Sequence, residues 1–171
     1  LRRRCDDVGA LLIFDEVMTS RMSAGGQQAR CGVLPDLTTL GKYLAGGMTF
    51  GAFGGRADVM AAFDPARGGT LTHGGTFNNN VVTMAAGAAA LRELLAADVL
   101  DALFERGTDL QHRLADVFAS SELPLCVTGL GSLMNLHTVA GPVRSPTDLA
   151  ASDPDLKQLL FHELLDRGIY L

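Results

Sequence analysis

The 171-residue sequence lacks tryptophan and contains only two lysines and three cysteines. The cysteines show no CxxC spacing, so neither a disulfide framework nor a zinc site is expected, and no metal is predicted. No apolar run approaches the roughly 20 residues that span a bilayer, and no apolar region of signal-peptide form follows the first arginines. We therefore expect a cytoplasmic protein without a membrane partner.

A net charge of -5 and twelve scattered arginines give no basic face, so a nucleic-acid partner is not expected. With 47% hydrophobic residues and 20 glycines, the composition is that of a globular protein with a real core. Position 1 is not methionine, residues 1–7 resemble the end of a helix, and residues 168–171 resemble the start of a strand. Both ends of the chain are therefore expected to be cut.

The first half of the sequence has the pattern of an α/β fold. Residues 8–14 form a continuous apolar run, which predicts a strand covered on both faces in a parallel sheet. Asp15 and Glu16 follow it at the carboxyl end, where ligands bind in open α/β sheets. After a loop with a short helix at residues 26–31, the β-favouring residues 37–40 lead directly to Lys42.

Further elements are predicted downstream. Asn78, Asn79 and Asn80 are candidate N-caps for a small-faced helix. The predicted elements are a helix at residues 80–96, a helix at residues 98–120, strand-like residues 125–136 and a helix at residues 154–167. A domain boundary is expected within residues 100–120, followed by a smaller α/β domain.

Lys42 and Lys157 are the two lysines, and only Lys42 has an unusual setting. Lys157 falls on the polar face of a predicted helix. Lys42 lies between a β segment and glycine-rich turns, and poor solvation there would favour the neutral, nucleophilic amine that forms a Schiff base. Considered alone, a lysine at a strand end that reaches solvent is the simpler explanation.

Asp15 offers the carboxylate that pyridoxal chemistry needs beside such a lysine. A carboxylate on the pyridine nitrogen keeps the ring protonated, so that it accepts electrons from the substrate carbanion. Asp15 lies 27 residues before Lys42, at the end of the predicted strand. Without Lys42, a helix cap or a strand-end salt bridge would explain it.

Three segments carry a resemblance to a known family. They are LIFDEVMTS at residues 12–20, GVLPDLTTLGK at residues 32–42 and the glycine-rich residues 46–56. The sequence resembles class III pyridoxal-phosphate-dependent aminotransferases, in the branch of glutamate-1-semialdehyde 2,1-aminomutase and the β-amino-acid (β-phenylalanine) aminotransferases. The resemblance implies an α/β fold of PLP-dependent transferase fold type I. Residues 1–105 would be the C-terminal half of the large cofactor-binding domain, and residues 106–171 the start of the small C-terminal domain.

The resemblance also implies the cofactor pyridoxal 5′-phosphate and roles for five residues. Lys42 would form the internal aldimine and shuttle the proton between substrate and cofactor, and Asp15 would pair with the pyridine nitrogen. Val17 would lie on one face of the ring. Met18 takes the place where many members have a glutamine near the ring hydroxyl. Thr76 would reach the phosphate of the neighbouring subunit, which implies a homodimer, although a helix cap is its simpler explanation.

The expected function is amino-group transfer between an amino acid, including a β-amino acid, and a keto acid. Intramolecular transfer by an aminomutase is the alternative, and a catalytically inactive fragment is a third reading. Residues 19–22 (TSRM) and 75–80 (GTFNNN) depart from the aminomutase pattern and favour the β-amino-acid branch. In the family, the phosphate loop, the ring-stacking aromatic residue and most substrate contacts fall outside the matched stretch, so this chain alone is expected to be inactive.

Overall fold

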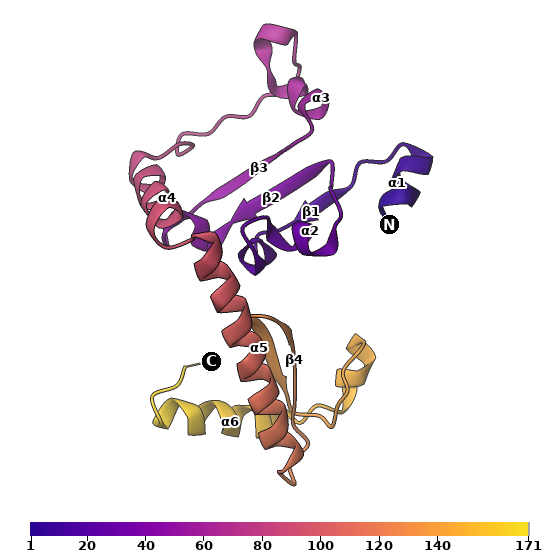
Figure 1. Cartoon of the computed structure of the whole chain (residues 1–171), viewed down its shortest axis with the longest axis vertical. Helices are drawn as coiled ribbons and strands as arrows, with labels where there is room; N and C mark the ends of the chain where they lie inside the picture. The colour runs from indigo at the N-terminus through magenta and orange to yellow at the C-terminus, as the bar shows by residue number, and fades with distance from the viewer. Residues whose placement is uncertain (171) are drawn as a thin grey trace. The chain divides into compact units, whose positions relative to one another are not determined.

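The computed structural model describes residues 1–170 and divides into two compact units, Leu1–Ala102 and Leu103–Leu171. Each unit is described by itself (Figure 1). The assignment of residues 1–105 and 106–171 to two domains of a larger enzyme stays a prediction. Among residues 1–170, no helix has both the length and the apolar character needed to cross a membrane.

The first unit is built on a small mixed sheet. Its elements are α1 (Arg2–Val8), β1 (Ile13–Asp15), the 3₁₀ helix η1 (Thr19–Met22), α2 (Gly26–Cys31), β2 (Leu37–Gly41), η2 (Lys42–Ala45), β3 (Gly51–Gly55), α3 (Ala57–Met60), η3 (Ala61–Phe63), η4 (Pro65–Arg67) and α4 (Val81–Glu93). The helix α5 (Ala97–Ala119) begins in this unit and continues into the second. The helices predicted near residues 26–31, 80–96 and 98–120 are confirmed.

The sheet has the strand order β1-β2-β3, which Figure 1 shows with α4 beside the carboxyl end of β2. β1 pairs with β2 in parallel, so that Asp15 lies opposite Thr39. β3 returns antiparallel to β2, with Gly51 opposite Gly41. Because β1 and β2 run in the same direction, Asp15 and the residue that follows β2, Lys42, come to the same edge of the sheet.

The strand predicted at residues 8–14 is wrong in its extent. Val8 is the last residue of α1, which ends at Gly9 in the left-handed conformation (φ 68°), and the strand begins only at Ile13. The expected cover on both faces is also wrong for the described residues, since the Ile13 side chain is 55% exposed. An apolar run alone does not separate the end of a helix from the start of a strand, whereas a glycine cap does.

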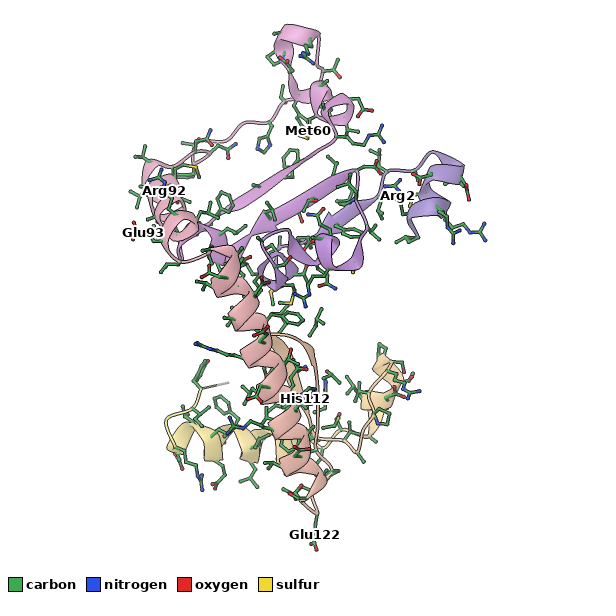
Figure 2. The ribbon with its side chains drawn as sticks, in the orientation of Figure 1. Arg2, Met60, Arg92, Glu93, His112 and Glu122 are labelled. Carbon is green, nitrogen blue, oxygen red and sulfur yellow. The ribbon has the colours of Figure 1, made fainter. Side chains whose placement is uncertain are left out.

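Asp36 ties together the end of the sheet at which β1 and β2 begin and β3 ends. The residue is only 4% exposed, and its side chain accepts hydrogen bonds from the Leu12 amide, Arg2 Nη1 and Arg56 Nη1, each at 2.7 Å. Figure 2 shows Arg2 on α1, on the side that faces the strands. The Leu12 amide, with the two guanidinium groups, holds the pKa of Asp36 well below its usual range.

The second unit packs the last part of α5 against a hairpin of β4 (Cys126–Leu130) and β5 (Leu133–His137), followed by η5 (Pro146–Ala151) and α6 (Pro154–Asp166). The strand-like pattern expected at residues 125–136 is confirmed, and the structure divides this segment into two paired strands. The segment turns at Gly131 (φ 53°), whose carbonyl accepts from Gln111 Nε2 at 2.6 Å. A Cβ on Gly131 would lie 2.3 Å from Phe104 Cδ2, so only glycine fits this turn.

The C-terminal helix agrees with the prediction for residues 154–167. Asp153 caps α6 by accepting from the amides of Asp155 and Leu156. The strand predicted at residues 168–171 does not form over residues 168–170, and Leu171 lies outside the described residues. Gly168 has φ 78° and its amide bonds the Leu165 carbonyl, so the chain turns at the helix end instead of extending.

We predict that Asp36→Asn destabilises the protein most at neutral pH. The folded state lowers the pKa of Asp36 from an ordinary value near 3.8, so its stabilising contribution is present above that value and is lost as the pH falls toward the folded pKa. Urea unfolding of the wild type and the variant at a series of pH values measures this. The gap between their midpoints should narrow below about pH 4.

Asp58→Asn is the matched control, because Asp58 pairs with the same Arg56 but is largely exposed. An exposed ion pair contributes little to stability, so the control should unfold close to the wild type. An equal loss of stability in Asp36→Asn and Asp58→Asn would contradict the larger contribution expected from the buried carboxylate.

Candidate active site

Asp15 ends β1 with its carboxylate oriented by two hydrogen bonds. Oδ1 accepts from the Val17 amide at 3.1 Å and from Thr39 Oγ1 at 2.8 Å. The Val17 amide first, then the Thr39 hydroxyl, and to a smaller degree the Lys42 ammonium hold the pKa of Asp15 below its ordinary value. Within residues 1–170 no hydrogen bond engages Oδ2. The side chain is therefore a fixed, ionised carboxylate with one oxygen available to a donor.

Lys42 follows β2 directly and opens η2 in the left-handed conformation (φ 55°). A non-glycine residue in this conformation is uncommon and strained unless its surroundings hold it. Its Nζ contacts Met18 Sδ at 2.6 Å. The expected poor solvation is wrong for the described chain, because Lys42 is exposed. The glycines around it have no side chains with which to cover the amine.

Val17 lies beside the backbone that carries Lys42. A Cβ added to Gly41 would lie 3.7 Å from Val17 Cγ1 and 3.1 Å from the Phe50 carbonyl. Gly41 therefore allows the backbone at Phe50 to approach the end of β2 closely, and the Val17 side chain lies at ordinary van der Waals distance from the same position. Val17 is half-buried and presents an apolar surface next to Lys42.

The helix α4 holds η2 from the other side. A Cβ on Gly87 would lie 3.1 Å from the Leu44 carbonyl, and one on Gly46 would lie 3.0 Å from the Ala86 carbonyl. Ala45 is fully buried in this contact region, and Gly46 has φ 61°. The small residues of α4 thus allow backbone-to-backbone packing directly behind the turn that positions Lys42.

Three residues near the site were missed in the sequence. Tyr43 Oη donates to Ser20 Oγ at 2.9 Å, and the Arg21 guanidinium lies 5.1 Å from the centre of the Tyr43 ring. These contacts tie η1 to η2, one residue from Lys42. No local pattern marks them, because the partners are more than twenty positions apart in the chain.

Thr76 lies in an exposed turn in which the Asn78 amide bonds the Gly75 carbonyl. The simpler explanation for Thr76, a helix cap, is wrong: Asn80 caps α4, with its Oδ1 accepting from the amides of Val82 and Thr83. In the part of the chain that the structure describes, no interaction joins Thr76 to Lys42 or Asp15. The Thr76 hydroxyl is therefore available to hydrogen-bond a group outside the described residues.

His73 does not line the Lys42 site. Its ring packs edge-on against Phe53 at 5.2 Å and Phe63 at 6.4 Å between centroids. These aromatic contacts fasten the segment before Thr76 to β3.

Two large grooves open on the first unit, and neither is lined by Asp15 or Lys42. One of about 940 Å³ is bordered by Thr38 and Leu40, which alternate with Thr39 along β2 and so point to the opposite face of the sheet. The other, of about 1030 Å³, is bordered by Phe53 and His73. The two site residues therefore project from the sheet edge in the open.

The arrangement has a clear chemical capacity. It brings an ionised carboxylate with an available oxygen and a primary amine to one sheet edge, with Val17 and Met18 beside them. This edge can accept a hydrogen bond from a protonated ring nitrogen at Asp15 and hold an aldehyde at Lys42.

Comparison with known proteins gives a consistent picture. The family model described as Aminotransferase class-III matches residues 1–171. β-Phenylalanine transaminase of Variovorax paradoxus is 58% identical over 170 residues, which are 99% of this chain and 39% of that protein. Its crystal structure superposes with a TM-score of 0.94 over the same shares of the two chains.

Two further solved structures are similar. One, described as a transaminase with PLP bound, is 34% identical with a TM-score of 0.85 over 100% of this chain and 39% of its own. A glutamate-1-semialdehyde aminomutase variant from Pseudomonas aeruginosa, in complex with PMP, is 25% identical with a TM-score of 0.83 over 99% and 40%. The chain thus spans about two fifths of the length of the relatives it matches.

The packing of α4 behind η2 predicts a graded response at Gly87. Gly87→Ala should be close to neutral, because a helix-propensity gain of about 1 kcal/mol offsets a tight contact with the Leu44 carbonyl. Gly87→Val, with two further methyl groups, should destabilise by about 1–3 kcal/mol through overpacking. Denaturant unfolding of the two variants measures the difference. Equal stability of the valine variant and the wild type would mean that η2 is not confined by α4.

Proposed function

The chain belongs to the class-III aminotransferases, and on that premise we propose that the whole protein binds pyridoxal 5′-phosphate at Asp15 and Lys42. We further propose that it transfers an amino group between an amino acid and a keto acid. The observation that carries this proposal is that Asp15 and Lys42 lie at the same edge of the sheet. There, the carboxylate is kept ionised by Val17 and Thr39, and the amine is exposed.

The cofactor, when bound, supplies a protonated aromatic ring that withdraws electrons from the substrate carbon. Asp15 would accept the hydrogen bond of the ring nitrogen through its available oxygen, and its depressed pKa suits that charge. Lys42 would hold the cofactor covalently through Nζ and, once released by substrate, carry the proton as general base and acid. The Lys42 amine is free to reach a bound cofactor because the residue is exposed and its Nζ has one recorded contact within residues 1–170, to Met18 Sδ.

Val17 would give the ring an apolar wall beside Gly41, and Met18 would lie near the ring hydroxyl. Thr76 would donate to the phosphate of the cofactor in a second subunit, which makes the functional unit a homodimer. Its exposed turn and its lack of a capping role within residues 1–170 support this assignment. The relevant partners are then the small amino and keto acids and a second copy of the protein.

The substrate class is proposed from the degree of similarity. The relative at 58% identity acts as a β-phenylalanine transaminase, whereas the aminomutase structure is 25% identical. Residues 19–22 and 75–80 also depart from the aminomutase pattern. A β-amino acid as amino donor and a keto acid as acceptor are therefore favoured over intramolecular transfer, which is the alternative that the assay below must separate.

Lys42→Ala should abolish the visible absorption band of the lysine-bound cofactor in the whole protein and lower amino transfer by at least about a hundredfold. The loss follows because, among residues 1–170, no second lysine lies at the sheet edge. Lys157→Ala is the control: it removes the second lysine of this sequence, on the exposed side of α6, and should keep both the band and the activity. A visible band that survives in Lys42→Ala would disprove the assignment.

The reaction products distinguish a β-amino-acid aminotransferase from an aminomutase. We expect the whole protein to form glutamate when it is incubated with a β-amino acid and 2-oxoglutarate. Chromatography of the mixture detects the product, and omission of the keto acid is the control. Conversion of glutamate-1-semialdehyde to 5-aminolevulinate without an added acceptor would instead favour the aminomutase.

A further inference from the structure

We propose that Glu16 is a positioning residue for the cofactor site. Its buried carboxylate fixes the chain at the end of β1 so that Asp15, Val17 and Met18 are held beside Lys42. This inference rests on the proposed function. Glu16 would not contact the cofactor itself but would support its binding by holding these three neighbours in place.

The Glu16 side chain is a buried carboxylate with three hydrogen-bond donors. It is 1% exposed, and its oxygens accept from Thr19 Oγ1 at 2.7 Å, the Gln27 amide at 3.0 Å and the Gln28 amide at 2.7 Å. Burying a carboxylate is costly unless hydrogen bonds replace its water. These three bonds supply that replacement and tie the end of β1 to residues eleven and twelve positions ahead.

The backbone of Glu16 is held as firmly as its side chain. Its amide donates to the Thr39 carbonyl at 3.0 Å, and its carbonyl accepts from the Ser20 amide at 3.0 Å. Thr39 therefore contacts both carboxylate residues, since its hydroxyl donates to Asp15. Any rotation of the peptide at Glu16 would disturb the Asp15 carboxylate at the same time.

Gly26 shows how closely the chain fits around this carboxylate. It has φ 71°, and a Cβ there would lie 2.8 Å from Glu16 Oε1. The left-handed conformation and the lack of space both require glycine. The loop from η1 to α2 is thus folded around the Glu16 side chain.

Asp15 and Glu16 are neighbours in an extended segment and have different roles: Glu16 anchors the chain, and Asp15 faces the proposed cofactor site. Successive side chains of an extended segment point to opposite sides, so the anchored Glu16 directs Asp15 toward the open edge. If the anchor loosens, the segment after Glu16 moves, the Val17 amide leaves Asp15 Oδ1, and Met18 leaves Lys42 Nζ. Both the orientation of the carboxylate and the place of the amine then become less defined.

The test compares the affinity of two variants for pyridoxal phosphate. Glu16→Gln keeps the size but replaces one acceptor oxygen by a donor that faces backbone amides. We expect its dissociation constant for pyridoxal phosphate, measured by equilibrium dialysis of the whole apoprotein, to rise roughly tenfold, the effect of one lost bond to a charged group. The visible absorption band should shift or weaken at saturating cofactor.

Asp36→Asn is the matched control, since Asp36 is an equally buried carboxylate with three donors at the opposite end of the strands. It should lower stability and leave the dissociation constant unchanged. A Glu16→Gln protein that is folded and binds the cofactor as tightly as the wild type overturns the inference. Wild-type protein that binds no cofactor overturns the proposed function itself, and the two failures are thus distinguishable.

Thr19→Val is the second variant, for the case in which Glu16→Gln does not fold. It removes only the hydroxyl that donates to Glu16 Oε2 and keeps the side-chain shape. A severalfold weaker affinity in the folded valine variant supports the inference, and an unchanged affinity overturns it.

Discussion

Two buried carboxylates fix the two ends of the β1–β2 strand pair, and the proposed site lies at the end that Glu16 fixes. Asp36 gathers the amino ends through Leu12, Arg2 and Arg56, and Glu16 fixes the carboxyl end through Thr19 and the first amides of α2. A buried carboxylate tolerates little displacement, because a lost donor leaves an uncompensated charge. The two carboxylates thereby give a sheet of three short strands a definite register, and only Glu16 acts at the edge where Asp15 and Lys42 lie.

The backbone conformation of Lys42 depends on a second constraint, the close packing around the turn that contains it. Its left-handed backbone is held between the end of β2 and α4, where Gly41, Gly46 and Gly87 bring backbone atoms into contact. Interiors packed at this density transmit small changes in volume to their neighbours. The glycines that position the lysine also leave it uncovered, so that placement and solvation of the amine are set by different parts of the molecule.

The sequence predicted the longer helices well, because these depend on local periodicity and, for α4, on an asparagine cap. It predicted burial poorly. The apolar residues 8–14 were assigned to one covered strand, but Gly9 ends a helix within them and Ile13 is exposed. The hairpin at Gly131 was missed because its cause is a contact with Phe104. The roles of Glu16 and Tyr43 could not be predicted, since their partners are distant in the chain.

The capping of α4 by Asn80 has a consequence for how such a site can change. Asn80 accepts hydrogen bonds from the amides of Val82 and Thr83 at the start of the helix. Within residues 1–170, the hydroxyl of Thr76, four positions earlier, therefore takes no part in capping it. Substitutions of Thr76 should therefore cost the helix behind the turn little stability. If Thr76 contacts the cofactor phosphate as proposed, that contact can change independently of the cap that starts α4.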